Sequence, residues 1–335
     1  MKFPAKILVL LFLLLSLGGC CGFDCNNDDN NKDPALLTLG FSDSIPEDLK
    51  EVWIEVDSIT FRRTGAEDVV VDTFTIPEQN ITNAETFSVD LLKYPGFAQL
   101  EVITDFQISA ATYSAVVIKI IANGVSSSYV LEAGDTAKAI TIGNGSGNLS
   151  LDGMRLSSGK QAFTVEFSLA QALQLQPDGR YLLATDGIRI ANNTTDARLS
   201  GSIEKSLFNT ATICAEKSDP EIGNRVYLYE GNSFSTNDLL ADVFTSDSNP
   251  VPPPIAVVPF AVASLSKVAS TGNWVYAFGY VPAGDYTMAF SCNTATDDAV
   301  NWNDLKIPLP VSQVYKLTLS EGENAVCNIA EGASC

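Results

Sequence analysis

The stretch Glu51-Val-Trp-Ile-Glu-Val-Asp-Ser-Ile-Thr-Phe61 alternates between apolar and polar residues in its first half. Two sets of side chains result, with Val52, Ile54 and Val56 on one face and Glu51, Trp53 and Glu55 on the other. A period of two residues is typical of a β-strand that buries one of its faces. The stretch therefore predicts a sheet that covers a hydrophobic core on one side.

Runs of similar character recur along the chain and predict further strands. They span residues 35–41, 69–71, 86–92, 113–121, 128–131, 137–142, 162–169 and 181–190, and later 198–203, 225–229, 273–280, 281–290 and 314–319. Several are separated by pairs that tolerate a positive φ, such as Asn144-Gly145, Asp152-Gly153 and Asp178-Gly179. Short helices are expected at residues 46–50 and 168–173. The proline-rich residues 249–254 predict an extended loop or edge segment.

These patterns predict an all-β chain with two antiparallel β-sandwich domains. The first domain is expected over residues 35–196 and the second over residues 197–335. Before them we expect a signal peptide over residues 1–19 and a lipidated cysteine with a flexible acidic tether over residues 20–34. A chain of 335 residues is long enough for about two domains.

The N-terminus has the parts of a bacterial lipoprotein signal. Lys2 and Lys6 precede an apolar run over residues 7–17, which is shorter than the about 20 residues that span a bilayer core. Leu17-Gly-Gly-Cys20 resembles the bacterial lipobox. We therefore expect cleavage before Cys20 and a diacylglycerol on its thiol, which is enough for stable membrane attachment. Since Cys21 rather than Asp follows, the outer membrane is favoured, on its periplasmic or its outer face. The alternative is an ordinary signal peptide cleaved nearby.

Residues 22–34 are polar and acidic and have no apolar period, so we interpret them as a tether that holds the folded part off the membrane. A calcium loop is the alternative, because carboxylates are calcium ligands. The candidate ligands are Asp24, Asp28, Asp29 and Asp33. The EF-hand spacing, with its central Gly and terminal Glu, is missing.

Seven cysteines occur, and six remain once Cys20 is taken as acylated. An even number in an exported chain favours disulfides, and no Cys-x-x-Cys is present to suggest a zinc or dithiol site. The four candidates after residue 210 are Cys214, Cys292, Cys327 and Cys335. Four cysteines allow three pairings, of which we favour Cys214 with Cys292 and Cys327 with Cys335. Cys21 and Cys25 could pair locally or bridge to another chain.

The composition argues against several function classes. A formal net charge of −20 argues against binding to DNA, RNA or anionic lipid head groups. The absence of histidine removes Ser-His-Asp and Cys-His catalysis and zinc sites built on imidazole. Gly-x-Ser-x-Gly is absent, and the Gly-rich residues 143–147 lack the Lys of a phosphate loop. We therefore expect no catalytic residues, no metal and no cofactor.

The order of the early strands resembles the bacterial lipoprotein family called domain of unknown function 4382, over about residues 35–195. The likeness rests on the segments 37–43, 51–59, 89–92, 108–118, 163–169 and 181–190. The Pro-Ala-Gly-Thr-Tyr turn of that family is here Ser109-Ala-Ala-Thr-Tyr113, without the Pro and the Gly. The resemblance implies a β-sandwich and no catalytic residues.

The later segment Tyr276-Ala-Phe-Gly-Tyr-Val-Pro-Ala-Gly-Asp-Tyr286 is similar to the strand–turn–strand of transthyretin-like and carboxypeptidase-regulatory-like domains. Pro282 and Gly284 make the turn, and Tyr286 begins the return strand with its ring inside. The resemblance implies a second β-sandwich and indicates little about function.

Four functions stay open. A membrane-anchored, non-enzymatic protein with a structural, adhesion or partner-binding role is favoured, with an unknown protein or glycan partner. A carbohydrate- or peptide-binding lipoprotein is the first alternative, and Trp53, Trp274 and Trp302 would be its candidate stacking platform. The third is a subunit of a surface assembly that accepts a partner strand at a sheet edge. The last is a hydrolase with two carboxyls in one cleft. Asp297, Asp298 and Asp304 could bind a metal, but an exposed acidic loop is the favoured interpretation.

Overall fold

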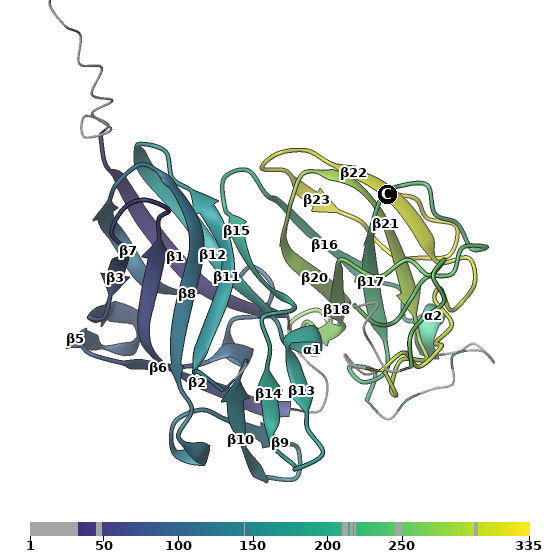
Figure 1. The fold of residues 1–335 in the computed structure, drawn as a ribbon. Helices are drawn as coiled ribbons and strands as arrows, with labels where there is room; N and C mark the ends of the chain where they lie inside the picture. The colour runs from purple at the N-terminus through teal and green to yellow at the C-terminus, as the bar shows by residue number, and fades with distance from the viewer. Residues whose placement is uncertain are drawn as a thin grey trace, which may run out of the picture. The chain divides into compact units, whose positions relative to one another are not determined.

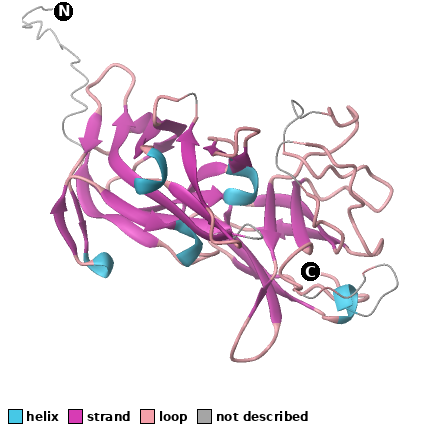
Figure 2. Cartoon of the chain, turned by 90° about the horizontal axis from the view of Figure 1, so that it is seen from below, coloured by secondary structure: helices cyan, strands magenta, loops and turns pink. Residues whose placement is uncertain are grey.

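The computed structural model describes residues 33–44, 49–143, 145–209, 214, 217, 219–244, 250–297 and 301–335. The expected signal peptide, Cys20, Cys21, Cys25 and most of the tether lie outside the described residues. Strands dominate the described part (Figure 2), and residues 33–335 form one compact unit. The all-β fold class is confirmed. No helix in the described ranges is long and apolar enough to cross a bilayer.

The first sheet is four-stranded and mixed (Figure 1). In spatial order it contains β15 (Ile188–Asn192), β12 (Gly159–Ser168), β1 (Ala35–Ser44) and β7 (Leu100–Ile108). β1 runs antiparallel to β7 but parallel to β12. Parallel neighbours need a crossover rather than a hairpin, and here the chain passes through most of the second sheet between β1 and β12. This sheet is therefore mixed, whereas the sequence patterns predicted antiparallel strands.

The second sheet packs against the first around a long strand, β2 (Leu49–Arg62). Its order is β11 (Asn148–Arg155), β8 (Thr112–Ile121), β2, β9 (Tyr129–Glu132), β10 (Ala137–Ile142), β14 (Tyr181–Leu183) and β13 (Leu173–Leu175), and β3 (Val69–Val71) and β6 (Phe87–Asp90) also pair with β2. β10 and β14 are parallel.

β2 buries the side chains that its alternation predicts. Val52, Ile54 and Val56 are fully buried. The pairing with β8 then shifts between Val56 and Ser58, and a β-bulge of this kind moves the next side chains to the opposite parity. Ile59 and Phe61 are therefore buried as well, and one strand covers the core along its whole length.

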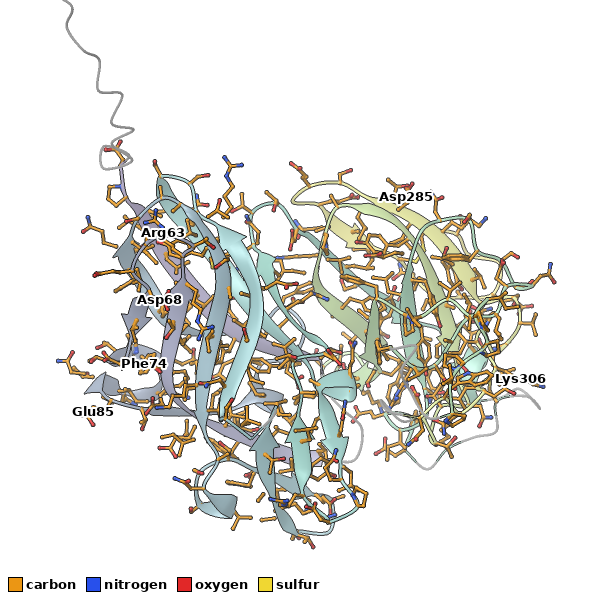
Figure 3. All side chains as sticks on the ribbon, viewed as in Figure 1. Arg63, Asp68, Phe74, Glu85, Asp285 and Lys306 are labelled. Atoms are coloured by element: carbon orange, nitrogen blue, oxygen red, sulfur yellow. A yellow bond between two sulfur atoms is a disulfide. The ribbon has the colours of Figure 1, made fainter. Side chains whose placement is uncertain are left out.

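Small elements close this first sheet pair. They are the hairpin of β4 (Phe74–Ile76) and β5 (Ile81–Ala84), the 3-10 turns η2 (Pro77–Gln79), η3 (Leu91–Lys93) and η4 (Gly124–Ser126), and the helix α1 (Leu169–Ala172). The core between the sheets is aromatic near its centre, where the ring of Phe41 lies 5.4 Å from that of Phe167 and 5.9 Å from that of Phe87. Phe74 is buried against the same group, whereas Glu85 and Lys306, also labelled in Figure 3, are exposed.

A second pair of four-stranded sheets follows from Ala197. One has the order β19 (Ser266–Lys267), β20 (Trp274–Val281), β16 (Ala197–Ile203) and β23 (Asn324–Val326), and the other has β18 (Ala261–Ser264), β17 (Arg225–Glu230), β21 (Gly284–Ser291) and β22 (Val314–Leu319). The helix α2 (Ser206–Asn209) follows β16. β23 runs parallel to β16, and every other pair is antiparallel. The domain boundary expected at residue 196 stays a prediction.

β17 is buried on both faces. Val226 and Leu228 face the core between the two sheets, whereas Tyr227 and Tyr229 stack at 6.4 Å under the long connections that precede β18 and β22. This double burial explains why Arg225-Val-Tyr-Leu-Tyr229 is apolar without alternation, because only a strand with one solvated face alternates.

Several predicted elements differ from those observed. Leu49 and Lys50 open β2 rather than ending a helix, and residues 45–48 lie outside the described part. The run at 181–190 is divided into β14 and β15, because residues 184–187 turn the chain. The helix expected at 168–173 is present as α1, and residues 250–253 form no regular element, as expected for the proline-rich segment.

Candidate functional site

The predicted disulfides are formed. Cys214 pairs with Cys292 with Cα atoms 5.7 Å apart, and Cys327 pairs with Cys335 at 4.9 Å. Both separations lie in the usual range for a disulfide. Cys20, Cys21 and Cys25 lie outside the described residues, so the predicted lipidation site stays a prediction.

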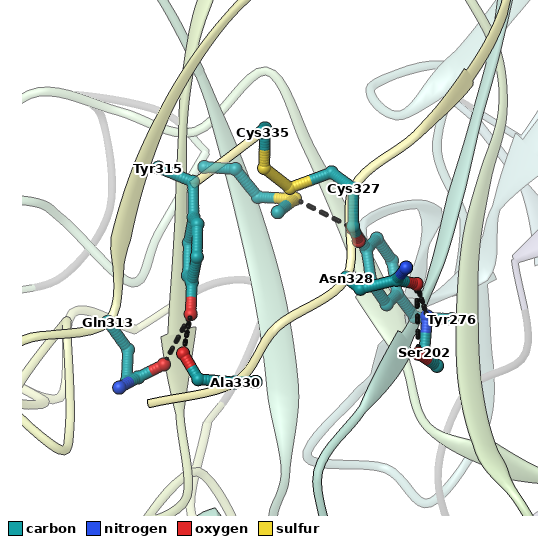
Figure 4. Close-up of a disulfide and its surroundings, with 9 residues drawn as sticks. Ser202, Tyr276, Gln313, Tyr315, Cys327, Asn328, Ala330 and Cys335 are labelled. Carbon is teal, nitrogen blue, oxygen red and sulfur yellow. Dashed lines mark hydrogen bonds between the residues drawn. A yellow bond between two sulfur atoms is a disulfide. The ribbon is translucent and has the colours of Figure 1, made fainter. Parts of the chain in front are cut away.

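Hydrogen bonds around the C-terminal disulfide hold the edge of one sheet in place (Figure 4). The Tyr276 hydroxyl donates a hydrogen bond of 2.6 Å to the carbonyl of Cys327. The Asn328 side-chain oxygen accepts from the backbone N–H and the hydroxyl of Ser202, and the Tyr315 hydroxyl donates to the carbonyl of Ala330. Residues 324–329 are thereby fixed beside β16.

The outer face of this sheet forms the floor of a groove of about 470 Å³. The loop Pro95–Phe97, which connects η3 to β7, forms one wall. The floor carries small side chains from four segments: Ser200 and Ser202 of β16, Val275 and Ala277 of β20, Ser266 of β19, and Val326 and Asn328 at the C-terminal edge. The volume lies within the range typical of ligand pockets.

No charged side chain lines this groove. Its lining consists of serines, one asparagine, one tyrosine and apolar residues, although the chain as a whole has a formal net charge of −20. Burying a charged group against such a surface is costly because nothing there pairs with it. The groove therefore suits an uncharged segment.

The wall of the groove is held rigidly. The ring of Phe97 lies 6.3 Å from that of Tyr280, edge to face, and 5.6 Å from the Arg198 guanidinium. The backbone at Gly96 has φ +63°, and a Cβ there would come 3.0 Å from the Cβ of Ala277. The loop backbone therefore lies directly on β20, where a larger residue would push it away.

The three tryptophans do not form a shared platform. Trp53 lies on β2 beneath the Lys93 ammonium group, and its indole N–H donates to Glu51. Trp274 is buried against Phe208 in the core of the second sheet pair, and Trp302 lies outside the strands. None of them lines the groove. The three tryptophans therefore do not build the carbohydrate-stacking platform considered from the sequence.

Of the acidic residues considered for a metal, Asp297 has structural partners instead. Asp297 accepts hydrogen bonds from Arg225 and, at 2.6 Å, from the Tyr227 hydroxyl, whereas Asp304 is exposed. Asp298 lies outside the described residues. In the described ranges no group of three or more Asp, Glu, Cys or His side chains is placed to hold a metal ion.

A buried carboxyl that sequence analysis did not single out tethers the same loops. Asp242 accepts backbone hydrogen bonds from Asn303 at 3.1 Å and from Leu305 at 2.8 Å. Burial raises the pKa of this carboxyl, and the nearby Asp297 charge acts in the same direction. Asp242 and Asp297 together fasten the loops that cover β17.

A second small site lies where the two sheet pairs meet. Glu166 of β12 and Arg189 of β15 are direct cross-strand partners and form an ion pair. Glu166 also accepts the backbone N–H of Tyr280, while Arg189 donates to the carbonyls of Phe278 and Tyr280. Burial raises the pKa of Glu166 to about 7, although the Arg189 charge acts against this.

This junction is too small for a substrate. The cavity there holds two carboxyls, Asp43 and Glu166, but its volume is about 20 Å³, which is enough for a water molecule only. A carboxylate-based hydrolase needs a cleft that admits a sugar ring between its two carboxyls. The junction therefore serves structure, not the hydrolysis considered from the sequence.

The groove itself was missed from the sequence, although a signal exists. Ser200-Gly-Ser202 and Ser264-Leu-Ser266 each place two hydroxyls two residues apart, and this spacing puts side chains of one strand on the same face. The segment Ser264–Ser266 passes from β18 in one sheet to β19 in the other. The two pairs of serines therefore come together only because the chain changes sheets there.

The likeness to known proteins is distant. No curated protein matches the chain. Among solved structures, the chain is similar to a leucine-rich repeat protein from Bacteroides thetaiotaomicron VPI-5482 (12% identity, TM-score 0.19, 90% of this chain and 26% of that chain). It is also similar to the shaft pilin spaA from Lactobacillus rhamnosus GG (9%, 0.20, 89% and 96%) and to a fimbrial protein from Bacteroides ovatus ATCC 8483 (10%, 0.16, 91% and 50%).

The chain spans about a quarter of the length of that leucine-rich repeat protein. With TM-scores of this size, the three structures carry no argument about function. The resemblance of the later segment to transthyretin-like domains stays a prediction. The family resemblance of the first unit is confirmed: residues 34–185 match the family described as Domain of unknown function (DUF4382).

Proposed function

We propose that this chain is a non-enzymatic protein of the bacterial cell envelope, anchored by a lipid on Cys20, that binds a protein partner through the groove on β16 and β20. The observation that carries the proposal is the groove itself. It combines a volume of about 470 Å³ with an uncharged lining in a strongly acidic chain. Binding sites of this kind are concave and largely apolar, with a few polar groups.

The described residues favour binding over catalysis. The buried carboxyls Glu166, Asp242 and Asp297 are occupied by structural hydrogen bonds rather than facing an open cleft. A protein partner is favoured over a glycan, because the Phe97 ring is already engaged by Tyr280 and Arg198. A sugar would need a free aromatic face to stack on.

Anchoring and display are tested on intact cells. Globomycin treatment should block processing of the wild-type chain, and Cys20→Ser should abolish acylation. Protease shaving then separates the two faces of the membrane, because only a surface-displayed chain is cut. Unchanged processing in globomycin, together with a Cys20 that carries no lipid, would refute the anchor.

The binding site is tested by placing the photoreactive residue p-benzoylphenylalanine at Ser202 of the full chain and irradiating intact cells. We expect a covalent adduct of defined mass. The same residue at Thr104, an exposed position on β7 that is outside the groove, should give none. If Ser202 gives no adduct, or if both positions label alike, the groove is not the binding site.

A further inference from the structure

The proline-rich connection before β18 belongs to the longest run of uncharged residues in the second sheet pair. Residues 249–266 contain no charged side chain. Ile255 is 79% exposed and Val251 is 64% exposed, and Val258 lies on the same loop. Exposed apolar side chains that gather on one loop mark an interaction site more often than scattered ones do.

This loop is fixed in shape, although it has no regular structure. The backbone N–H of Ala256 donates to Pro253 at 2.8 Å, and the N–H of Ala241 donates to the carbonyl of Val257 at the same distance. The N–H of Val257 donates to Leu239 at 2.9 Å. The prolines also restrict φ. A segment held in this way loses little conformational entropy on binding, which favours association.

Neither the loop nor the groove carries a charged side chain. The loop presents projecting apolar side chains without charge, and the groove is an uncharged hollow. Both belong to a chain with a net charge of −20, so most other ways of bringing two copies together would oppose like charges. A contact between these two surfaces avoids that repulsion locally.

We propose that the loop Val251–Val258 of one copy docks into the groove of a second copy, with Ile255 as the inserted side chain. This inference rests on the proposed function, because it names a second copy of the chain as the partner of that groove. Loop and groove are different surfaces, so the contact is head-to-tail and leaves one of each free. Contacts of this type build open chains unless the rotation closes a ring.

The first experiment uses the full chain in intact cells, with p-benzoylphenylalanine at Ile255. Irradiation should give a ladder of multimers of the chain, and the cross-linked peptide should contain Val326, Asn328 or residues 200–202. Val326→Glu in the same chain should reduce the adduct at least tenfold, because Val326 lines the groove and is 67% exposed, so the fold tolerates the change. Val70→Glu is the matched control, since Val70 is 51% exposed on β3, away from the groove, and the ladder should persist.

The second experiment separates head-to-tail docking from a symmetric contact. Two differently tagged full chains are co-expressed, one with Ile255→Glu and one with Val326→Glu. Neither variant should capture its own kind, whereas together they should form a one-to-one pair, because an intact groove meets an intact loop.

Each other outcome has a definite meaning. If Ile255→Glu abolishes self-capture but Val326→Glu does not, the loop binds elsewhere and the inference is overturned. If Ser202 cross-links to a different protein and Ile255 gives no multimers, the proposed function holds but the partner is not a second copy. If neither position gives an adduct, both proposals fail.

Discussion

Glu166 and Arg189 face each other across β12 and β15, and together they take the place of a missing strand beside β20. β19 pairs only with Trp274 and Val275 of β20. Beyond that point, Glu166 accepts the N–H of Tyr280 and Arg189 donates to the Tyr280 carbonyl. An open strand edge invites pairing with another chain. The side chains of Glu166 and Arg189 occupy the backbone hydrogen-bonding groups of Tyr280, so this part of the edge is not open to another strand.

Removing Arg189 should be costly. In Arg189→Ala the buried Glu166 loses its counter-charge and must either protonate or stay unpaired, and removing one partner of a buried ion pair costs about 3–5 kcal/mol. Urea unfolding at pH 7.5 measures the change in the free energy of unfolding. Lys160→Ala is the matched control: its ion pair with Asp105 is exposed, so a loss below about 1 kcal/mol is expected. Equal losses in both variants would contradict the proposed role of the buried pair.

The same pair makes stability depend on pH. Because burial raises the pKa of Glu166 to about 7 from 4.5, the folded chain binds a proton more readily than the unfolded chain between these values. The free energy of unfolding therefore falls as the pH rises from about 4.5 to about 7. We expect urea midpoints to be higher at pH 5 than at pH 7.5, and Glu166→Gln to flatten this difference. Subtracting the pH profile of Glu166→Gln from that of the wild type removes the contribution of the general charge repulsion in an acidic chain. A Glu166→Gln profile parallel to the wild type would show that another group is responsible.

Gly279 is a further test of the junction. Its φ is +74°, and a Cβ added there would collide with the Glu166 carboxylate. Gly279→Ala should cost about 1–2 kcal/mol for the backbone and about 1–3 kcal/mol more for overpacking. Gly272→Ala is the matched control, since φ is +72° there and nothing lies within 4 Å of the added Cβ. Only the backbone cost should appear in that variant, as measured by chemical unfolding.

In both sheet pairs a tyrosine hydroxyl hydrogen-bonds to the backbone of the turn that precedes it. The Tyr113 hydroxyl donates to the carbonyl of Ser109 at 3.0 Å, and the Tyr286 hydroxyl donates to that of Pro282 at 2.9 Å, four residues back in each case. Tyr113→Phe and Tyr286→Phe should each lower the free energy of unfolding by about 0.5–1.5 kcal/mol, the net worth of one hydrogen bond. Thermal unfolding of the two single variants and the double variant should give additive losses, because the two turns share no partner.

The two disulfides should differ in their effect on stability. Cys214 and Cys292 are 78 residues apart and Cys327 and Cys335 are 8 apart. Loop-closure entropy predicts losses of about 4.5 and about 2.5 kcal/mol when each is replaced by a pair of alanines. Guanidinium unfolding of the two double variants checks the order. A larger loss for the C-terminal pair would mean that its anchoring of residues 324–329 outweighs chain entropy.

Several strands were well predicted because their signals are local. Alternation in Glu51–Phe61 and the apolar runs at 137–142 and 314–319 correspond to β2, β10 and β22. The longest strands that were missed are β7 and β11; the other missed strands, such as β4, β5 and β18, have at most four residues. In β7 the exposed Thr104 and Asp105 lie side by side, and in β11 an interior Asp-Gly pair suggests a turn. Both are edge strands of their sheets. An edge strand pairs with a neighbour on one side only, so its sequence pattern is less restricted.

The sequence by itself determined the all-β class and the family resemblance of the first unit, because both follow from local residue patterns. It only favoured the pairing of the four late cysteines, since three pairings were possible and the structure decided between them. Only the tertiary structure decided which polar residues are buried. Glu166 lies on the polar face of its strand. Nothing near it in the sequence indicates that this face is covered by Tyr280, which is 114 residues away, rather than by solvent. The groove has the same origin. Its floor and wall come from segments that the chain brings together only after two sheets have formed, and period-two patterning carries no information about which face a distant segment covers.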